Sequence, residues 1–143
     1  MTHTIRPATP ADQKWIQRLL RSHRDLAGSF YWSWQGWVAN PQKHTWLVAE
    51  DGGLPVGTLH YYRSVRRKAY CVAEVMVEPF ARRHGVGRQL LGAVPEPIVL
   101  TTNADNPESH QFYLALGFSR LGESKTKRGA PLVVYGKGTP CAE

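Results

Sequence analysis

The chain has 143 residues, a formal net charge of +7 at neutral pH and a hydrophobic fraction of 42%. This length fits one domain, and the composition excludes a disordered chain. No apolar run is long enough to span a membrane, the first residues carry no apolar signal segment, and the two cysteines form no disulfide or metal-binding pattern. We therefore expect a single cytoplasmic domain over residues 1–143, with no metal and no membrane partner.

The charge balance favours anionic partners, because 18 Lys and Arg residues face only 11 Asp and Glu residues. A phosphorylated cofactor, an acidic protein, a nucleic acid or a membrane surface would each suit this charge. Charge alone does not choose among them.

The first half of the chain predicts a strand, a helix and then three strands joined by hairpins. Residues 4–8 form the first strand, and a Thr-Pro pair begins a helix that ends near His23. The segment after it mixes aromatic residues with Gly and Ser, and predicts a short helix or an ordered loop. Strands follow over 45–51, 55–62 and 69–77, separated by a Gly-Gly turn and a basic hairpin loop.

The second half of the chain alternates helices and strands. A helix over 87–94 is followed by a strand at 98–102 and by a helix capped by Asn106. The last two strands lie near 119–123 and 132–135. The strand–helix–strand step implies one parallel pair among hairpin-linked strands. We therefore expect an α/β (α+β) fold, with a mixed, mostly antiparallel central sheet of six to seven strands flanked by about four helices.

A basic glycine loop joins the third hairpin strand to the next helix. Glycines in this position let backbone N–H groups converge on an anion, and the helix N-terminus adds its positive dipole end. The pattern fits a pyrophosphate cradle, and it also fits a glycine loop with a solvated basic face. Neither a P-loop nor a dinucleotide-binding fingerprint is present. The loop reads Arg82-Arg83-His84-Gly85-Val86-Gly87-Arg88.

A second motif follows, in the helix that Asn106 caps and that ends in Gly-Phe. Taken in order, the two segments resemble the GNAT superfamily of N-acetyltransferases over most of residues 4–136. Ser109 stands where the family commonly has Ala. The run Val77-x-Pro79-x-x-Arg82-x-x-Gly85-x-Gly87 is similar to the acetyl-CoA motif of the family, and Asn106-x-x-Ser109-x-x-Phe112-Tyr113-x-x-x-Gly117-Phe118 is similar to its second cofactor motif.

The resemblance implies an acyltransferase that moves an acetyl group from acetyl-CoA to an amine by direct attack in a ternary complex. Backbone groups of the third hairpin strand would anchor the cofactor and polarise the thioester. The basic loop would hold the phosphates. The implied cofactor-binding residues are Val75, Met76, Val77, Arg82, Arg83, His84, Gly85, Val86, Gly87, Arg88, Asn106 and Tyr113.

Two side chains are candidates for proton transfer. Tyr113 is neutral at pH 7 and could protonate the leaving thiolate from a helix face away from an expected buried stripe of Phe112, Ala115 and Leu116. Glu74 precedes Val77 by three residues and could take the amine proton directly or through water. A surface or salt-bridged role is the alternative for Glu74. His60 and His110 are rival bases.

The acceptor is the least defined part of the prediction. By resemblance, the aromatic run with Tyr31, Trp34 and Trp37 lines its pocket, although core packing or a dimer contact also explains these rings. The basic segments 63–68 and 125–128 would repel a simple polyamine. We expect a small-molecule amine with an aromatic or apolar body, or an amino group on a larger anionic partner.

Two alternatives stay open from the sequence. One is a CoA-binding regulatory module without efficient turnover. The other is an acetyltransferase that acts on an amine linked to a nucleic acid, for which the basic segments would form the electrostatic footprint. A monomer and a homodimer are both compatible with the sequence.

Overall fold

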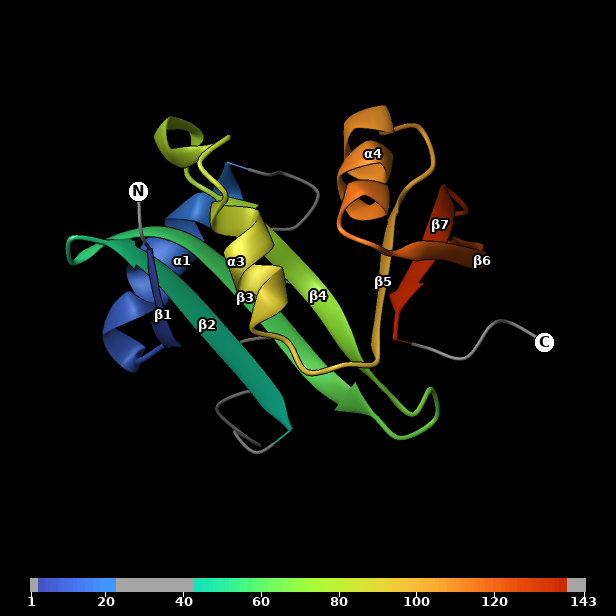
Figure 1. Cartoon of the computed structure of the whole chain (residues 1–143), viewed down its shortest axis with the longest axis horizontal. Helices are drawn as coiled ribbons and strands as arrows, with labels where there is room; N and C mark the ends of the chain where they lie inside the picture. Colours follow the sequence, from blue (N-terminus) through green and yellow to red (C-terminus); the bar gives the residue numbers. More distant parts are fainter. Residues whose placement is uncertain (1–2, 23–42, 139–143) are drawn as a thin grey trace. The chain divides into compact units, whose positions relative to one another are not determined.

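The expected architecture is confirmed in a computed structural model, which describes residues 3–22 and 43–138 (Figure 1). Seven strands occur in these residues, and they form one mixed sheet in the order β1-β2-β3-β4-β5-β7-β6. The segment expected to be a short helix or an ordered loop lies outside the described residues. The strands are β1 (Thr4–Pro7), β2 (His44–Asp51), β3 (Leu54–Ser64), β4 (Ala69–Val77), β5 (Ile98–Asn103), β6 (Ser119–Lys125) and β7 (Pro131–Lys137).

The described residues also contain three α-helices, α1 (Gln13–Arg21), α3 (Val86–Gly92) and α4 (Pro107–Ala115), and two short 3-10 helices, η1 (Pro10–Asp12) and η3 (Pro79–Ala81). None of these helices is long and apolar enough to cross a membrane. The chain divides into two compact units. The first unit comprises residues 1–63 and 72–94, and the second comprises residues 64–71 and 95–143.

The first unit packs one helix on each face of its strands. Ile16 and Leu19 of α1 join Trp46 and Val48 of β2 in the hydrophobic core. Side chains alternate between the two faces of a strand. The residues of β2 and β3 that lie between these core positions therefore point to the opposite face of the sheet. On that face α3 covers the strands, as Figure 1 shows. The sequence periodicity of α1 and the alternation in β2 thus account for the two layers.

The hairpin between β2 and β3 has a defined register. Gly52 and Gly53 form its turn with φ angles of 59° and 86°, a region that favours glycine. This turn, together with a register shift between Ala49 and Glu50, sets Trp46 opposite His60 and His44 opposite Tyr62. The register therefore brings two histidines onto one face of adjacent strands.

The second unit contains the parallel step that the sequence predicts. Near the start of β4, Tyr70 and Cys71 pair in parallel with Ile98 and Val99 of β5. The strand β7 then pairs antiparallel with both β5 and β6. The helix α4 starts at Pro107 and is followed by Gly117, whose φ angle of 93° suits a helix end.

The buried face of α4 differs from the expectation. Phe112, expected in the buried stripe, is 38% exposed, whereas Tyr113 is 9% exposed. Ala115 is also exposed, and Leu116 is half-buried. The reason is that apolar residues lie on all sides of this short helix. Packing of Tyr113 against Phe118, rather than periodicity, selects the buried face.

Candidate active site

The basic loop leaves β4 through η3 and enters α3. Its backbone reverses at Arg83 and Gly85, which have φ angles of 67° and 80°. A side chain at Gly85 would meet open space, so the glycine serves the backbone conformation rather than a close contact. The charged members of the loop are all exposed, namely Arg82, Arg83, His84 and Arg88. The loop therefore offers positive charge and turned backbone to an anion from solvent.

The start of α3 lies close against β3 because Gly57 has no side chain. A Cβ atom at Gly57 would lie 2.7 Å from Cγ1 of Val86 and 3.2 Å from Cδ1 of Leu90. Val86 is 1% exposed, so its side chain packs inward, and only its backbone is available to a ligand. Gly57 is thus a supporting residue of the loop that sequence reasoning missed.

The expected anchoring segment of β4 alternates in burial. Met76 is 3% exposed and belongs to the hydrophobic core, whereas Val75 and Val77 are half-buried. The predicted role of this segment, anchoring the cofactor, depends on backbone groups. The packing of the side chains does not test that role, which stays a prediction.

Glu74 is the buried end of a row of hydrogen-bonded side chains in the first unit. Its Oε2 lies 2.9 Å from Nδ1 of His60, and Nε2 of His60 lies 3.1 Å from Nδ1 of His44. The side chains of His60 and Glu74 are each 2% exposed, whereas His44 is half-buried. The structure therefore joins two residues that the sequence treated as rivals and adds His44, which sequence reasoning missed.

Aromatic packing holds the row in place. The ring of Trp46 stacks on His60 with 4.6 Å between centroids and 12° between planes. His44 and His60 lie within 21° of coplanarity. Burial lowers the pKa of His44, and the neighbouring His60 and Lys43 lower it further, while Glu74 acts in the opposite sense. His44 therefore remains largely neutral at pH 7.

Tyr113 lies in a cluster of rings in the second unit. Its ring meets Phe118 edge-on, with 5.6 Å between centroids, and Tyr135 at 6.0 Å. Burial raises the pKa of Tyr113 to about 12. The phenol therefore keeps its proton at pH 7, as a proton donor must.

The other predicted residues of α4 have structural partners. The side chain of Asn106 caps the helix by accepting a hydrogen bond from the backbone N–H of Ser109 at 3.3 Å. His110 lies 2.6 Å from the hydroxyl of Tyr135 through Nδ1, and 3.1 Å from the carbonyl oxygens of Asn103 and Ala104 through Nε2. Both ring nitrogens of His110 are thus engaged, which disfavours it as a base.

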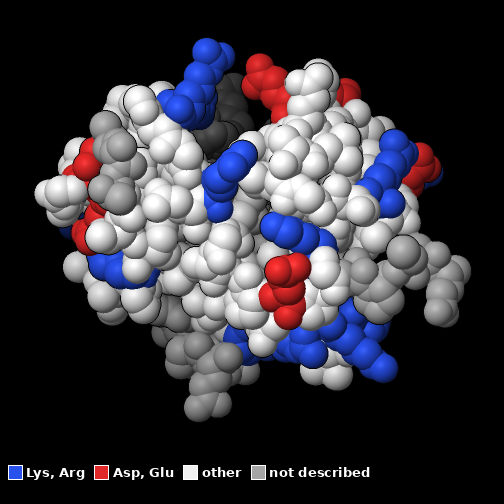
Figure 2. Space-filling view, in the orientation of Figure 1, with Lys and Arg blue, Asp and Glu red and all other residues white. Residues whose placement is uncertain are grey.

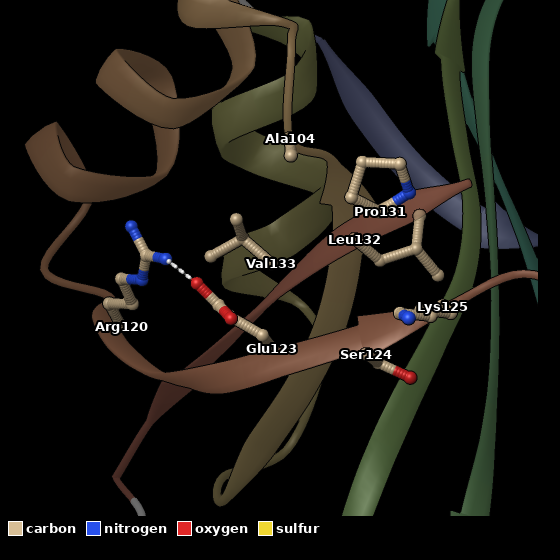
Figure 3. A pocket seen from close by; sticks show the side chains of 8 residues that line it. All are labelled: Ala104, Arg120, Glu123, Ser124, Lys125, Pro131, Leu132 and Val133. Carbon is tan, nitrogen blue, oxygen red and sulfur yellow. Dashed lines mark hydrogen bonds and ion pairs between the residues drawn. The ribbon is translucent and has the colours of Figure 1, made fainter. Parts of the chain in front are cut away.

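A cavity of about 370 Å³ lies on β6 and β7 of the second unit (Figure 3). Arg120 and Glu123 form an ion pair at 2.8 Å on its wall, and Lys125 stands farther along β6. The sequence did not single out this cavity. The predicted acceptor residues Tyr31, Trp34 and Trp37 lie outside the described residues.

No group of three or more His, Cys, Asp or Glu side chains within residues 3–22 and 43–138 could hold a metal ion. The chemistry that these residues offer is anion binding at the basic loop and proton transfer at Tyr113 and in the row of Glu74, His60 and His44.

Comparison with solved structures identifies the fold. Ard1 from Thermoplasma volcanium has a TM-score of 0.80 at 19% identity, covering 96% of this chain and 97% of that chain. A GNAT family acetyltransferase from Bacillus cereus has a TM-score of 0.72 at 18% identity, with coverages of 96% and 97%. The spermidine/spermine N-acetyltransferase SpeG from Vibrio cholerae has a TM-score of 0.71 at 15% identity, with coverages of 95% and 92%.

Sequence comparison identifies the family. No curated protein matches the chain. The family model described as the acetyltransferase (GNAT) domain matches residues 42–120, which is more than half of the chain. The matched range contains the basic loop, Glu74 and Tyr113. With its fold, its two motifs in order and this match, the chain belongs to the GNAT acetyltransferase family.

Proposed function

We propose that the protein is a single-domain N-acetyltransferase that moves an acetyl group from acetyl-CoA to an amine by direct attack in a ternary complex. The observation that carries the proposal is the basic loop, with its exposed arginines and its backbone turned at Arg83 and Gly85. Family membership supplies the acetyl donor. Acetyl-CoA brings an activated thioester, and the pyrophosphate of CoA suits the charge and backbone of the loop.

The residues of the chain divide the remaining work. Backbone groups of Val75, Met76 and Val77 would anchor the cofactor and polarise the thioester carbonyl. As the amine nitrogen bonds to the carbonyl carbon and the C–S bond breaks, Tyr113 would donate the proton of its hydroxyl to the thiolate. Glu74 would be the final acceptor of the proton that the amine gives up. Asn106, as well as capping α4, would contact the cofactor.

Binding of acetyl-CoA provides the direct test. At a concentration a hundredfold above Kd, the cofactor should stabilise the protein by about 2.7 kcal/mol. This corresponds to a rise in Tm of roughly 5–10 °C for a domain of this size. Gly85→Glu should abolish the rise, because its carboxylate would stand where the pyrophosphate binds.

The matched control is Gly85→Ala. It carries the same backbone strain at a φ angle of 80° but adds no charge. It should keep at least part of the rise in Tm. Equal stabilisation of Gly85→Glu and the parent would contradict the assignment of the loop. Binding of acetyl-CoA without acetylation of any amine in a mass-spectrometric screen would instead favour a regulatory module.

The proposed acceptor is an amine with an aromatic or apolar body, or an amino group on a larger anionic partner. Two basic turns support the anionic choice. Arg66, Arg67 and Lys68 are exposed on the turn between β3 and β4, and Lys127 and Arg128 are exposed between β6 and β7. Basic side chains are also visible on several parts of the face in Figure 2. A polycation would meet repulsion at such a surface.

The charge argument has its own experiment. Replacing Arg66 and Arg67 by Ala should raise KM several-fold for an anionic acceptor, because the variant loses part of the electrostatic attraction between the protein surface and the acceptor. The KM for acetyl-CoA and for an uncharged aromatic amine should stay unchanged. Added salt should reproduce the effect in the parent. Strong preference of the parent for spermidine over anion-linked or aromatic amines would overturn the proposed acceptor class.

A further inference from the structure

The row formed by Glu74, His60 and His44 poses a question about access. Glu74 is the proposed final proton acceptor, yet its side chain is 2% exposed and bonded to His60, which is equally buried. Buried carboxylates exchange protons with a substrate only through groups that reach it. Of the three side chains, His44 alone is partly exposed. A proton that ends on Glu74 therefore needs a route through the two imidazoles.

The hydrogen bonds define that route atom by atom. When Glu74 is ionised and both imidazoles are neutral, the carboxylate accepts from Nδ1–H of His60. This leaves Nε2 of His60 as an acceptor, so His44 must donate from its own Nδ1. The lone pair of His44 then lies on Nε2. Among the described residues no hydrogen bond reaches this nitrogen.

We infer that Glu74, His60 and His44 form one proton-transfer unit, and that Nε2 of His44 is the atom at which the unit takes the proton from the acceptor amine. This inference rests on the proposed function and deepens it. His44 becomes the catalytic base, whereas His60 and Glu74 become positioning residues. The direct or water-mediated contact of Glu74 with the amine is replaced by contact at His44.

The transfer balances without leaving a charged ring in the interior. A proton arriving at Nε2 of His44 allows the Nδ1 proton of His44 to pass to Nε2 of His60. The Nδ1 proton of His60 then passes to Oε2 of Glu74. Both hydrogen bonds are kept and their directions reverse, and the carboxylate is neutralised. Reversal of the same shifts releases the proton from His44 to solvent.

Geometry and electrostatics both favour this unit. Donor–acceptor distances of 2.9 and 3.1 Å are hydrogen bonds, and stacking of Trp46 fixes the ring of His60. The titratable neighbours of His44 among the described residues are Lys43, His60, Tyr62 and Glu74. The lowered pKa of His44 keeps its Nε2 unprotonated at pH 7, ready to accept.

The first test needs no substrate. Nitrogen NMR of histidine-labelled protein reports which ring nitrogen carries the proton. At high pH, His44 should carry its proton on Nδ1, with Nε2 bare. Glu74→Gln keeps an amide oxygen to accept from His60 but cannot take up a proton. In this variant the protonation of His44 should move to lower pH, because the proton can no longer pass to a carboxylate and the anion that raises the pKa of His44 has been removed.

Two NMR results would overturn the inference. One is titration of His44 at the same pH in the parent and in Glu74→Gln. The other is a proton retained on Nε2 of His44 throughout the titration. Asp51→Asn serves as the matched control, because it removes one carboxylate from the far end of the same strand, and the titration of His44 should not change.

The second test is kinetic, and uses acetyl-CoA with an amine that the parent acetylates. His44→Gln and Glu74→Gln should each lower kcat/KM at least about tenfold and remove the same acidic limb of its pH profile. The kcat/KM of the double variant should equal that of the less active single variant, because the residues act as one unit. Losses that multiply would overturn the inference. A parent that acetylates no amine would overturn the proposed function, while the NMR result would stand independently.

Discussion

Among the histidines that the structure describes, two have hydrogen-bond partners at both ring nitrogens, and the chemical nature of those partners differs. His60 in the first unit lies between a carboxylate and a second imidazole. His110 in the second unit lies between a tyrosine hydroxyl and two backbone carbonyls. A carbonyl oxygen accepts a hydrogen bond but does not take the proton at neutral pH. The partners of His60 therefore suit the proton transfer that we propose, whereas those of His110 make it a fixed connection between α4, β5 and β7.

Replacing each of the two histidines in turn should distinguish their roles, and we expect the largest effect on activity from these variants. His60→Gln breaks the link between His44 and Glu74, and we expect kcat/KM for acetylation to fall by about tenfold to a hundredfold with a changed pH profile. His110→Ala should keep the pH profile of the parent. Steady-state kinetics across pH on both variants gives the measurement. A changed profile in His110→Ala, with none in His60→Gln, would reverse the comparison.

Two tyrosines of the second unit extend the comparison. Tyr113→Phe removes only the donated proton, and turnover should fall at least roughly tenfold with little change in the Kd for CoA. Tyr135→Phe is the matched control, because it removes a hydroxyl whose bond is to His110. Its turnover should stay within about twofold of the parent. Unchanged turnover in Tyr113→Phe would leave that residue with a packing role alone.

The fixed connection at His110 should be visible in stability. His110→Ala removes the ring that joins the hydroxyl of Tyr135 to two carbonyl oxygens. We expect the free energy of unfolding to fall by about 1–2 kcal/mol. Urea denaturation at pH 7 gives the value. A variant as stable as the parent would show that the hydrogen bonds of His110 contribute nothing to folding.

The smallest expected effect is a pH dependence of stability. Because the pKa of His44 is lower in the folded chain than in the unfolded chain, the unfolded chain binds more protons between the two values. Stability should therefore decline as pH falls through about 6.5, the pKa of an unperturbed histidine. His44→Gln should reduce this slope in denaturation experiments at several pH values. A slope that is equal in both proteins would contradict the pKa direction.

Most of the fold was predictable because its signals are local. Turn glycines, proline stops and alternating apolar residues predicted each described strand and the starts of α3 and α4 to within a few residues. The buried face of α4 was not predictable, because apolar residues occur on every side of this helix, Tyr113 and Phe112 among them. Only contact with Phe118 distinguishes the two rings.

The candidate site was predictable in part. The basic loop and the motif with Tyr113 are continuous in sequence, and so could be found there. The hydrogen bond between His44 and His60 could not be found in this way, because 15 residues lie between them in the sequence. Counting outward from Gly52 and Gly53 would pair His60 with Thr45. A register shift between Ala49 and Glu50 instead sets His60 opposite Trp46, on the same face as His44, and this shift has no signal in the sequence.

Gly57 has a consequence for how this enzyme can vary. The residue touches no proposed substrate, yet α3 approaches β3 closely only because position 57 carries no side chain. Any larger residue there would lift the first turn of α3 together with the end of the loop that the helix anchors. If the loop binds the acetyl donor as we propose, the bulk of a single strand residue sets the affinity for that donor. Substitutions at position 57 should then weaken cofactor binding while every arginine of the loop stays in place.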